Sequence, residues 1–218
     1  MKKVLVLCDD IWHPVEVIEK GLEPLQDKVY HFDFIKDAKD ILTPEMLCEY
    51  DLVMNCKCNN ITNGNSAEWF EDGVTEVGPA EFTEFVKNGG RLLSVHAGNT
   101  YHEKNAPKYA ELIGNSFVGH PPRCTVNVKT VGDHKILDGV SDFVIRDEHY
   151  NIVLTAKDAE VFLESESESG GKQVAGYTRK YGKGRICVLT PGHILSVWRN
   201  PQFQRLLINS VEWCTEED

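Results

Sequence analysis

The chain lacks a long apolar run, and its first apolar stretch is short. No segment approaches the run of about 20 apolar residues that a membrane helix needs. Residues 4–8 form an apolar run that ends at Asp9, which is too short for the core of a signal peptide. The pattern is typical of a β-strand buried on both faces. We therefore expect no membrane as a partner.

Basic residues are few relative to acidic ones. The 23 lysines and arginines stand against 34 aspartates and glutamates, which gives a formal net charge of -11. This balance disfavours binding to the phosphate backbone of nucleic acids and to anionic lipids. We expect no nucleic acid as a partner.

The cysteines show neither a paired framework nor a CxxC spacing. All seven are scattered along the chain: Cys8, Cys48, Cys56, Cys58, Cys124, Cys187 and Cys214. An odd number without such a pattern is typical of a reducing compartment, so we expect a cytoplasmic protein. We interpret Cys56 and Cys58, which end an apolar strand, as core and loop residues rather than a metal or redox site.

The first half of the chain alternates between strand and helix patterns. No Pro/Gly/Ser-rich linker divides the 218 residues, so we expect a single domain over residues 1–218. Strand patterns lie at 4–8, 29–35, 51–56 and 91–95, and helix patterns at 14–25, 43–50 and 78–90. This alternation predicts an α/β fold with a doubly wound, mostly parallel sheet. The long segment 57–77 between two of these elements includes Trp69, which we expect to line a pocket or to anchor the loop.

The second half has a different pattern. Short strands at 124–129, 159–163 and 173–179 predict additional antiparallel or edge strands. Residues 164–171 (ESESESGG) are interpreted as a solvated hairpin tip. A last core strand is expected at 185–190, followed by a helix that Asn200 and Pro201 begin.

His96 follows the strand at 91–95 and is the most informative candidate for a functional residue. Ligands of open α/β sheets bind beyond the carboxyl ends of the strands, where His96 would lie. The spacing Ser94-x-His96-x-Gly98 looks like a nucleophile elbow. Because the elbow residue is histidine rather than serine or cysteine, ordinary triad chemistry is not supported.

Three other segments carry polar residues that a packed core would not favour. They are Gly119-His120-Pro121-Pro122, Asp147-Glu148-His149-Tyr150 and Thr190-Pro191-Gly192-His193. Together with His96 and His102 they predict one convergent site. His13, His31 and His134 are expected to be structural residues.

The same segments resemble a known family. HAGNT at 96–100, GHP at 119–121, DEHY at 147–150, GKGR at 182–185 and PGH at 191–193 occur in the order of the corresponding motifs of ThuA-like (trehalose utilisation) proteins. The resemblance implies a flavodoxin-like, class I glutamine amidotransferase-like fold, with His96 in the place of the catalytic cysteine. It also implies a role in sugar utilisation, beside oxidoreductases that convert disaccharides to 3-keto sugars. The site residues that it implies are His96, His120, Asp147, Glu148, Tyr150 and His193.

We predict an enzyme that cleaves or rearranges a glycoside or a 3-keto-sugar by acid–base chemistry. A 3-keto group acidifies the neighbouring C–H, so elimination needs a base, an acid for the leaving oxygen and stabilisation of an enolate. The predicted catalytic residues are His96, Glu148, His193 and Tyr150. The predicted substrate-binding residues are Asn99, His102, His120, Asp147 and Trp69.

A divalent metal such as zinc is also expected, because several histidines and a carboxylate form a suitable ligand set. The predicted ligands are His96, His149, His193 and Glu148. We expect no nucleotide cofactor, a small sugar as the substrate and a homo-oligomer as the assembly. The alternative is a non-catalytic carbohydrate-binding or regulatory protein on the same fold. A glutamine amidotransferase is disfavoured by the missing cysteine.

Overall fold

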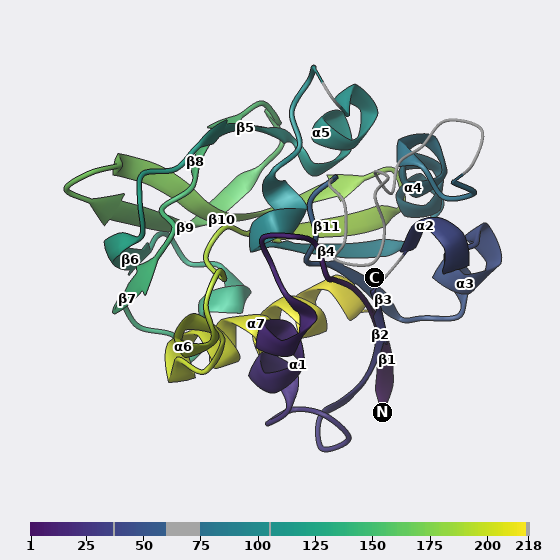
Figure 1. The fold of residues 1–218 in the computed structure, drawn as a ribbon, viewed down its shortest axis with the longest axis horizontal. Helices are drawn as coiled ribbons and strands as arrows, with labels where there is room; N and C mark the ends of the chain where they lie inside the picture. The colour runs from purple at the N-terminus through teal and green to yellow at the C-terminus, as the bar shows by residue number, and fades with distance from the viewer. Residues whose placement is uncertain (37, 60–74, 105, 217–218) are drawn as a thin grey trace.

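A nine-stranded sheet forms the centre of the protein (Figure 1). The structure, a computed structural model, describes residues 1–36, 38–59, 75–104 and 106–216. Across the sheet the strand order is β2-β1-β3-β4-β11-β10-β9-β6-β7. The first five strands of this order are parallel: β2 (Tyr30–Ile35), β1 (Lys2–Leu7), β3 (Leu52–Asn55), β4 (Arg91–Val95) and β11 (Gly184–Leu189). The predicted doubly wound, mostly parallel core is confirmed.

The second half of the chain extends this sheet with antiparallel strands, as predicted. They are β10 (Gly171–Tyr181), β9 (Glu160–Ser167), β6 (Cys124–Thr130) and β7 (Phe143–Asp147). A separate two-stranded sheet pairs β5 (Asn115–Gly119) with β8 (Asn151–Leu154).

The prediction that residues 164–171 form a solvated tip is wrong for most of that segment. Residues 164–167 belong to β9, and residue 171 begins β10. Ser165 is 2% exposed and Ser167 is 5% exposed, because both hydroxyls contact the buried ring of His149. Ser165 and Ser167 therefore face inward, and only the turn between the strands, which includes the exposed Ser169, matches the expectation.

Helices cover both faces of the sheet, each over its own hydrophobic core (Figure 1). One face carries α1 (Val15–Leu22), α6 (Leu195–Trp198) and α7 (Pro201–Thr215). The other carries α2 (Ala38–Ile41), α3 (Pro44–Cys48), α4 (Pro79–Lys87) and α5 (Pro107–Ile113). Two 3₁₀ turns, η1 (His96–Asn99) and η2 (Lys135–Leu137), complete the elements. Burial of the sheet on both faces explains why the inner parallel strands β1, β3, β4 and β11 are largely apolar, whereas the outer strand β2 alternates with polar residues.

The predicted helix starts are visible as caps. Thr43 Oγ1 accepts the backbone N–H of Met46, and the carboxamide oxygen of Asn200 accepts that of Gln202. Proline follows each cap at the first helical position, where its missing N–H has no cost. These local signals fix the beginnings of α3 and α7.

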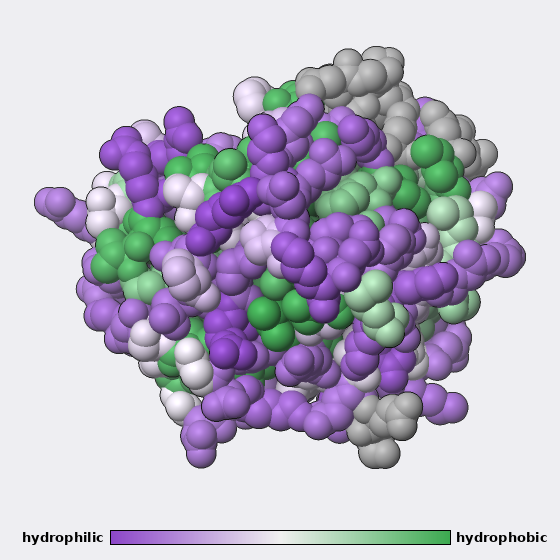
Figure 2. Space-filling view, turned by 90° about the horizontal axis from the view of Figure 1, so that it is seen from below, coloured by the Kyte–Doolittle hydropathy of each residue, from purple (hydrophilic) through white to green (hydrophobic). Residues whose placement is uncertain are grey.

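The surface carries few large apolar side chains. Figure 2 shows a face on which hydrophilic residues dominate and apolar residues form separate groups. Trp12 stands out because 63% of this residue is exposed. Among the described residues, no helix combines the length and the apolar character that spanning a bilayer requires.

Candidate functional site

Three parallel strands deliver histidines to the same edge of the sheet. His96 follows β4 directly, His193 lies four residues beyond the end of β11, and His13 lies in the loop after β1. Because β4 and β11 pair in parallel, with Val95 opposite Leu189, the segments that follow them lie side by side. The expectation from the carboxyl-edge rule therefore holds for the positions of His96 and His193.

The chain makes a strained turn at His96, as the elbow-like spacing suggested. Its φ is 44°, in the left-handed region that costs about 1–2 kcal/mol for a residue with a Cβ atom. The turn also brings backbone segments into close approach. A Cβ atom on Gly98 would lie 2.2 Å from the carbonyl oxygen of Asn55, so only glycine fits there.

The buried ring of His96 is held in one orientation. Its Nδ1 lies 2.8 Å from the carbonyl oxygen of Thr190, and because a carbonyl can only accept, Nδ1 carries the proton. The Nε2 lone pair is then left in a buried position without a hydrogen-bond partner. Burial lowers the pKa of His96 to about 4, so the ring is neutral at pH 7 and offers Nε2 as a ligand or a base.

His13, which the sequence suggested was structural, belongs to this cluster. Its ring lies 5.2 Å from that of His96 and 5.2 Å from that of His193. The Nδ1–H of His13 donates to the buried carboxylate of Asp10, at 2.8 and 2.9 Å from the two oxygens. The Nε2 atom therefore faces the cluster, 3.4 Å from the hydroxyl of Tyr150. The missed signal was the carboxyl-edge rule, which applies to the loop after β1 as it does to His96.

Glu148 reaches the histidines from the connection between β7 and β8. Its Oε2 lies 3.2 Å from Nδ1 of His193, 3.5 Å from Nε2 of His96 and 3.5 Å from Nε2 of His120. Burial alone would raise the pKa of this carboxyl, but the surrounding histidines outweigh burial and lower the pKa to about 2. Glu148 is therefore ionised at neutral pH.

The four side chains form a plausible cation site. Ligand atoms of His13, His96, Glu148 and His193 all lie within 4.8 Å of one another. His193 Nδ1, like His96 Nε2, is buried without a hydrogen-bond partner, and burial lowers the pKa of His193 to about 4. Lone pairs and a carboxylate that face one another are mutually unfavourable unless a cation lies between them. Three imidazoles and one carboxylate suit zinc or a similar divalent ion.

The contacts behind these ligands are those that metal sites use. Metal-binding histidines usually donate their second N–H to a carboxylate or a carbonyl, which fixes the ring. Asp10 does this for His13, and the Thr190 carbonyl does it for His96. Asp147 has a related role, since its carboxylate accepts the backbone N–H of Gly192 at 2.8 Å and that of His193 at 3.1 Å. It is 1% exposed and positions the loop after β11 rather than facing a ligand.

His149 does not join the cluster, which corrects the predicted ligand set. Its Nδ1 lies 2.6 Å from Ser167 Oγ and its Nε2 lies 2.9 Å from Ser165 Oγ. Both ring nitrogens are therefore occupied inside the antiparallel half of the sheet. The structure places His13 in the position that the sequence had assigned to His149.

Three of the predicted substrate-binding residues do not line the pocket described below. Asn99 is fully buried, and its Nδ2 donates to the carbonyl of Leu189 at 2.9 Å. His102 is half-buried, and its Nδ1 accepts the backbone N–H of Lys104 at 3.2 Å. Asp147 is buried, as described above. Trp69 lies outside the described residues.

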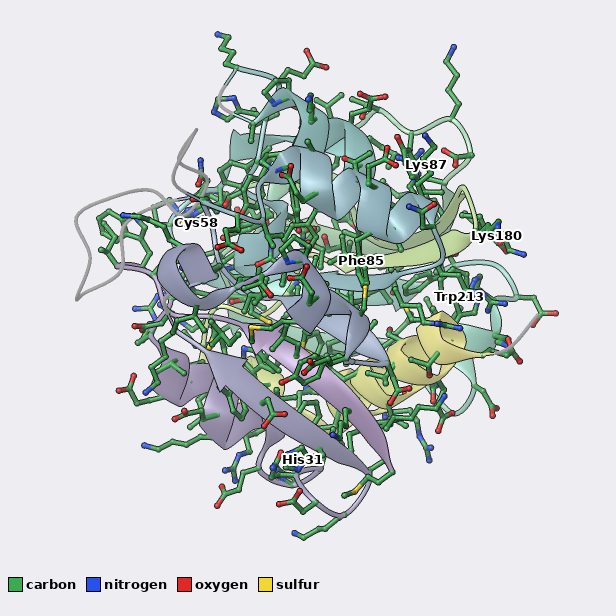
Figure 3. The ribbon with its side chains drawn as sticks, turned by 90° about the vertical axis from the view of Figure 1, so that its right-hand side faces the viewer. His31, Cys58, Phe85, Lys87, Lys180 and Trp213 are labelled. Carbon is green, nitrogen blue, oxygen red and sulfur yellow. The ribbon has the colours of Figure 1, made fainter. Side chains whose placement is uncertain are left out.

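The other two histidines behave as expected. His31 pairs with Asp27 on the outer strand β2, and Figure 3 separates it widely from Cys58 at the site. His134 is buried against η2, where its Nδ1 accepts the N–H of Ile136.

A pocket of about 640 Å³ opens above the cluster. His13, Glu148 and His193 of the cluster line it, and we call this part the floor of the pocket; Tyr150 and His120 also line it. The complete lining is Ile11, Trp12, His13, Cys58, Asn59, Thr100, Phe117, His120, Glu148, Tyr150 and His193. The volume falls within the range of about 300–1,000 Å³ that is typical of small-molecule sites.

Tyr150 connects the buried histidine to the open pocket. Its ring stacks on His96, with centroids 4.0 Å apart, and on His120, with centroids 5.5 Å apart. Burial and the Glu148 charge raise the pKa of Tyr150, so its hydroxyl remains a hydrogen-bond donor.

The cysteines near the site match the interpretation as core and loop residues. Cys56 is 2% exposed and Cys58 is 8% exposed. Burial raises the pKa of both thiols. Cys58 Sγ also lies near Asp10 and His13, but the Asp10 carboxylate already accepts the N–H of Cys58 at 3.1 Å and the His13 ring N–H.

These features describe a mixed α/β protein, consistent with the class I glutamine amidotransferase-like fold, with a histidine–carboxylate cluster at the carboxyl edge of its parallel strands. The ThuA family model, described as trehalose utilisation, matches residues 3–214. The chain therefore belongs to the ThuA family, and the predicted family is confirmed. None of the curated proteins compared with the chain matches it.

Solved structures show the same fold. A ThuA-like protein from Bacteroides uniformis has a TM-score of 0.75 at 19% identity, covering 100% of this chain and 92% of that one. A cytoplasmic protein from Salmonella typhimurium has a TM-score of 0.66 at 14% identity, with 100% of each chain covered. A β-galactosidase from Rahnella sp. R3 has a TM-score of 0.63 at 16% identity, and the match covers 98% of this chain but 31% of that enzyme.

Proposed function

We propose that the protein is a cytoplasmic sugar-utilisation enzyme that cleaves or rearranges a 3-keto-glycoside, with a divalent cation held by His13, His96, His193 and Glu148. The observation that carries this proposal is the convergence of these four side chains, three of which, His13, Glu148 and His193, line one pocket. Membership of a family described as trehalose utilisation supports a sugar as the substrate.

The reaction that suits this site is an elimination. Removal of the proton at C2 of the 3-keto ring forms an enolate across C2 and C3. The C3 carbonyl then re-forms as a double bond develops between C1 and C2, and the C1–O bond to the second sugar breaks. The leaving oxygen takes up a proton, and addition of water across C1 and C2 gives the hydrolysis products. No electrons leave the substrate, so the reaction needs no nucleotide cofactor.

Groups at the floor of the pocket stabilise the enolate oxygen. A divalent cation, when bound, supplies Lewis-acid polarisation of the C3 oxygen. Tyr150 contributes a hydroxyl that burial keeps protonated, so it donates a hydrogen bond where negative charge develops. His96, His193 and Glu148, which we expected to be catalytic, then serve mainly to hold the cation.

His120 removes the proton at C2. It is the histidine of the pocket that lies outside the four-residue cluster. Its Nδ1 lies 3.0 Å from the carbonyl of Pro121, which leaves Nε2 to accept a proton on the pocket side. The side chain is 33% exposed and 3.5 Å from Glu148. A histidine with one nitrogen anchored and the other at the pocket, beside the Glu148 carboxylate, suits a general base.

Metal analysis of protein purified without chelators or a histidine-rich tag tests the cation site. We expect near-stoichiometric divalent metal in the native protein and loss of most of it in His13→Ala. His102→Ala is the matched control, because this half-buried histidine lies outside the cluster, and it should retain the metal. Equal metal content in native protein and His13→Ala would contradict the assignment.

Turnover is tested separately with 3-keto-trehalose, by measuring release of free glucose. We expect release that a chelator abolishes and added metal restores, and we expect at least a 100-fold loss of kcat in His120→Ala. Binding of the sugar without any release would instead favour the carbohydrate-binding alternative.

A further inference from the structure

Trp12 is a large apolar residue held at the surface beside the site. It is 63% exposed, yet its position is fixed, because its backbone N–H donates to Asp10 at 2.9 Å. The same buried carboxylate holds the ring of His13. Further backbone bonds join Asp10 and His13 in both directions, at 3.2 and 3.3 Å. The backbone at Trp12 and the ring of His13 are therefore held by the same carboxylate.

Three large apolar side chains line the pocket. Trp12 lines it together with Ile11 and Phe117, and the ring of Phe117 packs edge-on against Tyr150 with centroids 4.9 Å apart. None of these three side chains belongs to the four-residue cluster. An exposed aromatic side chain beside a pocket is more informative than one isolated on a smooth surface.

The charge of the pocket restricts the ligand. Its lining, within the described part of the chain, contains no lysine or arginine. The whole chain also carries a net charge of -11. An anionic sugar, such as a phosphorylated one, would meet repulsion without a compensating cation at the wall.

We propose that Trp12, Ile11 and Phe117 form a subsite for the second, non-reacting ring of an uncharged disaccharide, whose first ring reaches the floor of the pocket. This subsite rests on the proposed function and names its substrate more closely. Sugar rings present a face of C–H groups that packs on an aromatic ring, and indole is the largest such surface. Binding a remote ring in this way supplies energy that can be used to orient the reacting ring.

Calorimetric titration of the metal-loaded protein with sugars that do not react tests the subsite. The ligands are trehalose, maltose and sucrose as uncharged disaccharides, methyl α-glucoside as a single ring, and trehalose 6-phosphate as the anionic counterpart. We expect Trp12→Ala to weaken the best disaccharide about tenfold, Trp12→Phe to weaken it less, and both to leave methyl α-glucoside within twofold. The phosphorylated sugar should bind at least tenfold more weakly than trehalose.

Val144→Ala is the matched control, since Val144 is 58% exposed on β7 and does not line the pocket. It should bind each sugar like the native protein. Disaccharide binding that is unchanged in Trp12→Ala, weakened equally for the single ring, or absent from the native protein overturns the subsite. Because none of these sugars is turned over, a failure of the proposed reaction leaves this result intact, and the two proposals fail separately.

Discussion

Replacement of Asp10 by asparagine tests whether the cluster is built to hold a cation. Asp10 is 1% exposed, and the hydrogen bond from His13 outweighs the effect of burial and lowers the pKa of its carboxyl. The carboxylate accepts the Nδ1–H of His13, which directs Nε2 into the cluster. Asparagine keeps the shape but replaces one oxygen with an NH₂ group, so the His13 ring loses its charged acceptor.

The magnitude follows from this geometry. Loss of a carboxylate that orients a metal-binding histidine costs about 10- to 100-fold in metal affinity, or about 1.4–2.7 kcal/mol. Asp10 also accepts the backbone N–H groups of Trp12, His13 and Cys58. We therefore expect a loss of folding stability of about 1.5–3 kcal/mol as well.

The assay is competition for zinc against a chromophoric chelator at pH 7, with circular dichroism to show that each variant is folded. Asp27→Asn is the matched control, because Asp27 pairs at 2.7 Å with His31 of the outer strand β2, and Figure 3 shows His31 far from Cys58 at the site. It should bind zinc like the native protein. Affinity of Asp10→Asn within twofold of native, or an equal loss in Asp27→Asn, would refute the reasoning.

Three further predictions concern stability and catalysis. Burial lowers the pKa of His149 in the folded protein below the value of about 6.5 that histidine has in an unfolded chain. Between these two pKa values the unfolded chain binds more protons, so stability rises with pH. Denaturation of His149→Gln should show a smaller loss between pH 7 and pH 5 than native protein; an equal loss contradicts this. Gly98→Ala should lower stability by about 1–3 kcal/mol, because its Cβ would lie 2.2 Å from the Asn55 carbonyl; an unchanged melting temperature would count against the elbow geometry. Tyr150→Phe should keep its stacking on His96 but lose about 10- to 100-fold in kcat, and unchanged turnover would remove its hydroxyl from the mechanism.

The parallel half of the fold could be predicted from the sequence because its signals are local. β1, β3, β4 and β11 are largely apolar runs, and α3, α4 and α7 begin with proline next to a cap or a turn residue. The elements β5, β7 and β8 were not predicted. They are at most five residues long, and β5 and β8 are stabilised by pairing with each other across a long stretch of sequence. Local propensity has little information about such pairs.

The site was predictable to the extent that it follows one sheet edge. His96 and His193 were found because they follow apolar strands. Glu148 lies in the antiparallel half, and only its cluster of polar neighbours marked it. His149 was misplaced because adjacent residues on an extended segment point to opposite sides, so a residue next to Glu148 faces away from the cluster. His13 was missed because the two aspartates and the proline around it indicate a loop, and no apolar strand precedes it directly.

The geometry at His96 argues that the cluster is a functional feature rather than a structural one. The residue adopts a left-handed backbone conformation, and its Nε2 is buried without a hydrogen-bond partner. Together these cost about 2–5 kcal/mol, and a packed apolar residue at this position would avoid the second part of that cost. His193 Nδ1 is left without a partner in the same way, and both nitrogens face the ionised Glu148. A divalent cation satisfies all three groups at once, whereas hydrogen bonds among them cannot: neither Nε2 of His96 nor the carboxylate carries a proton, and an N–H at Nδ1 of His193 could donate to only one of them.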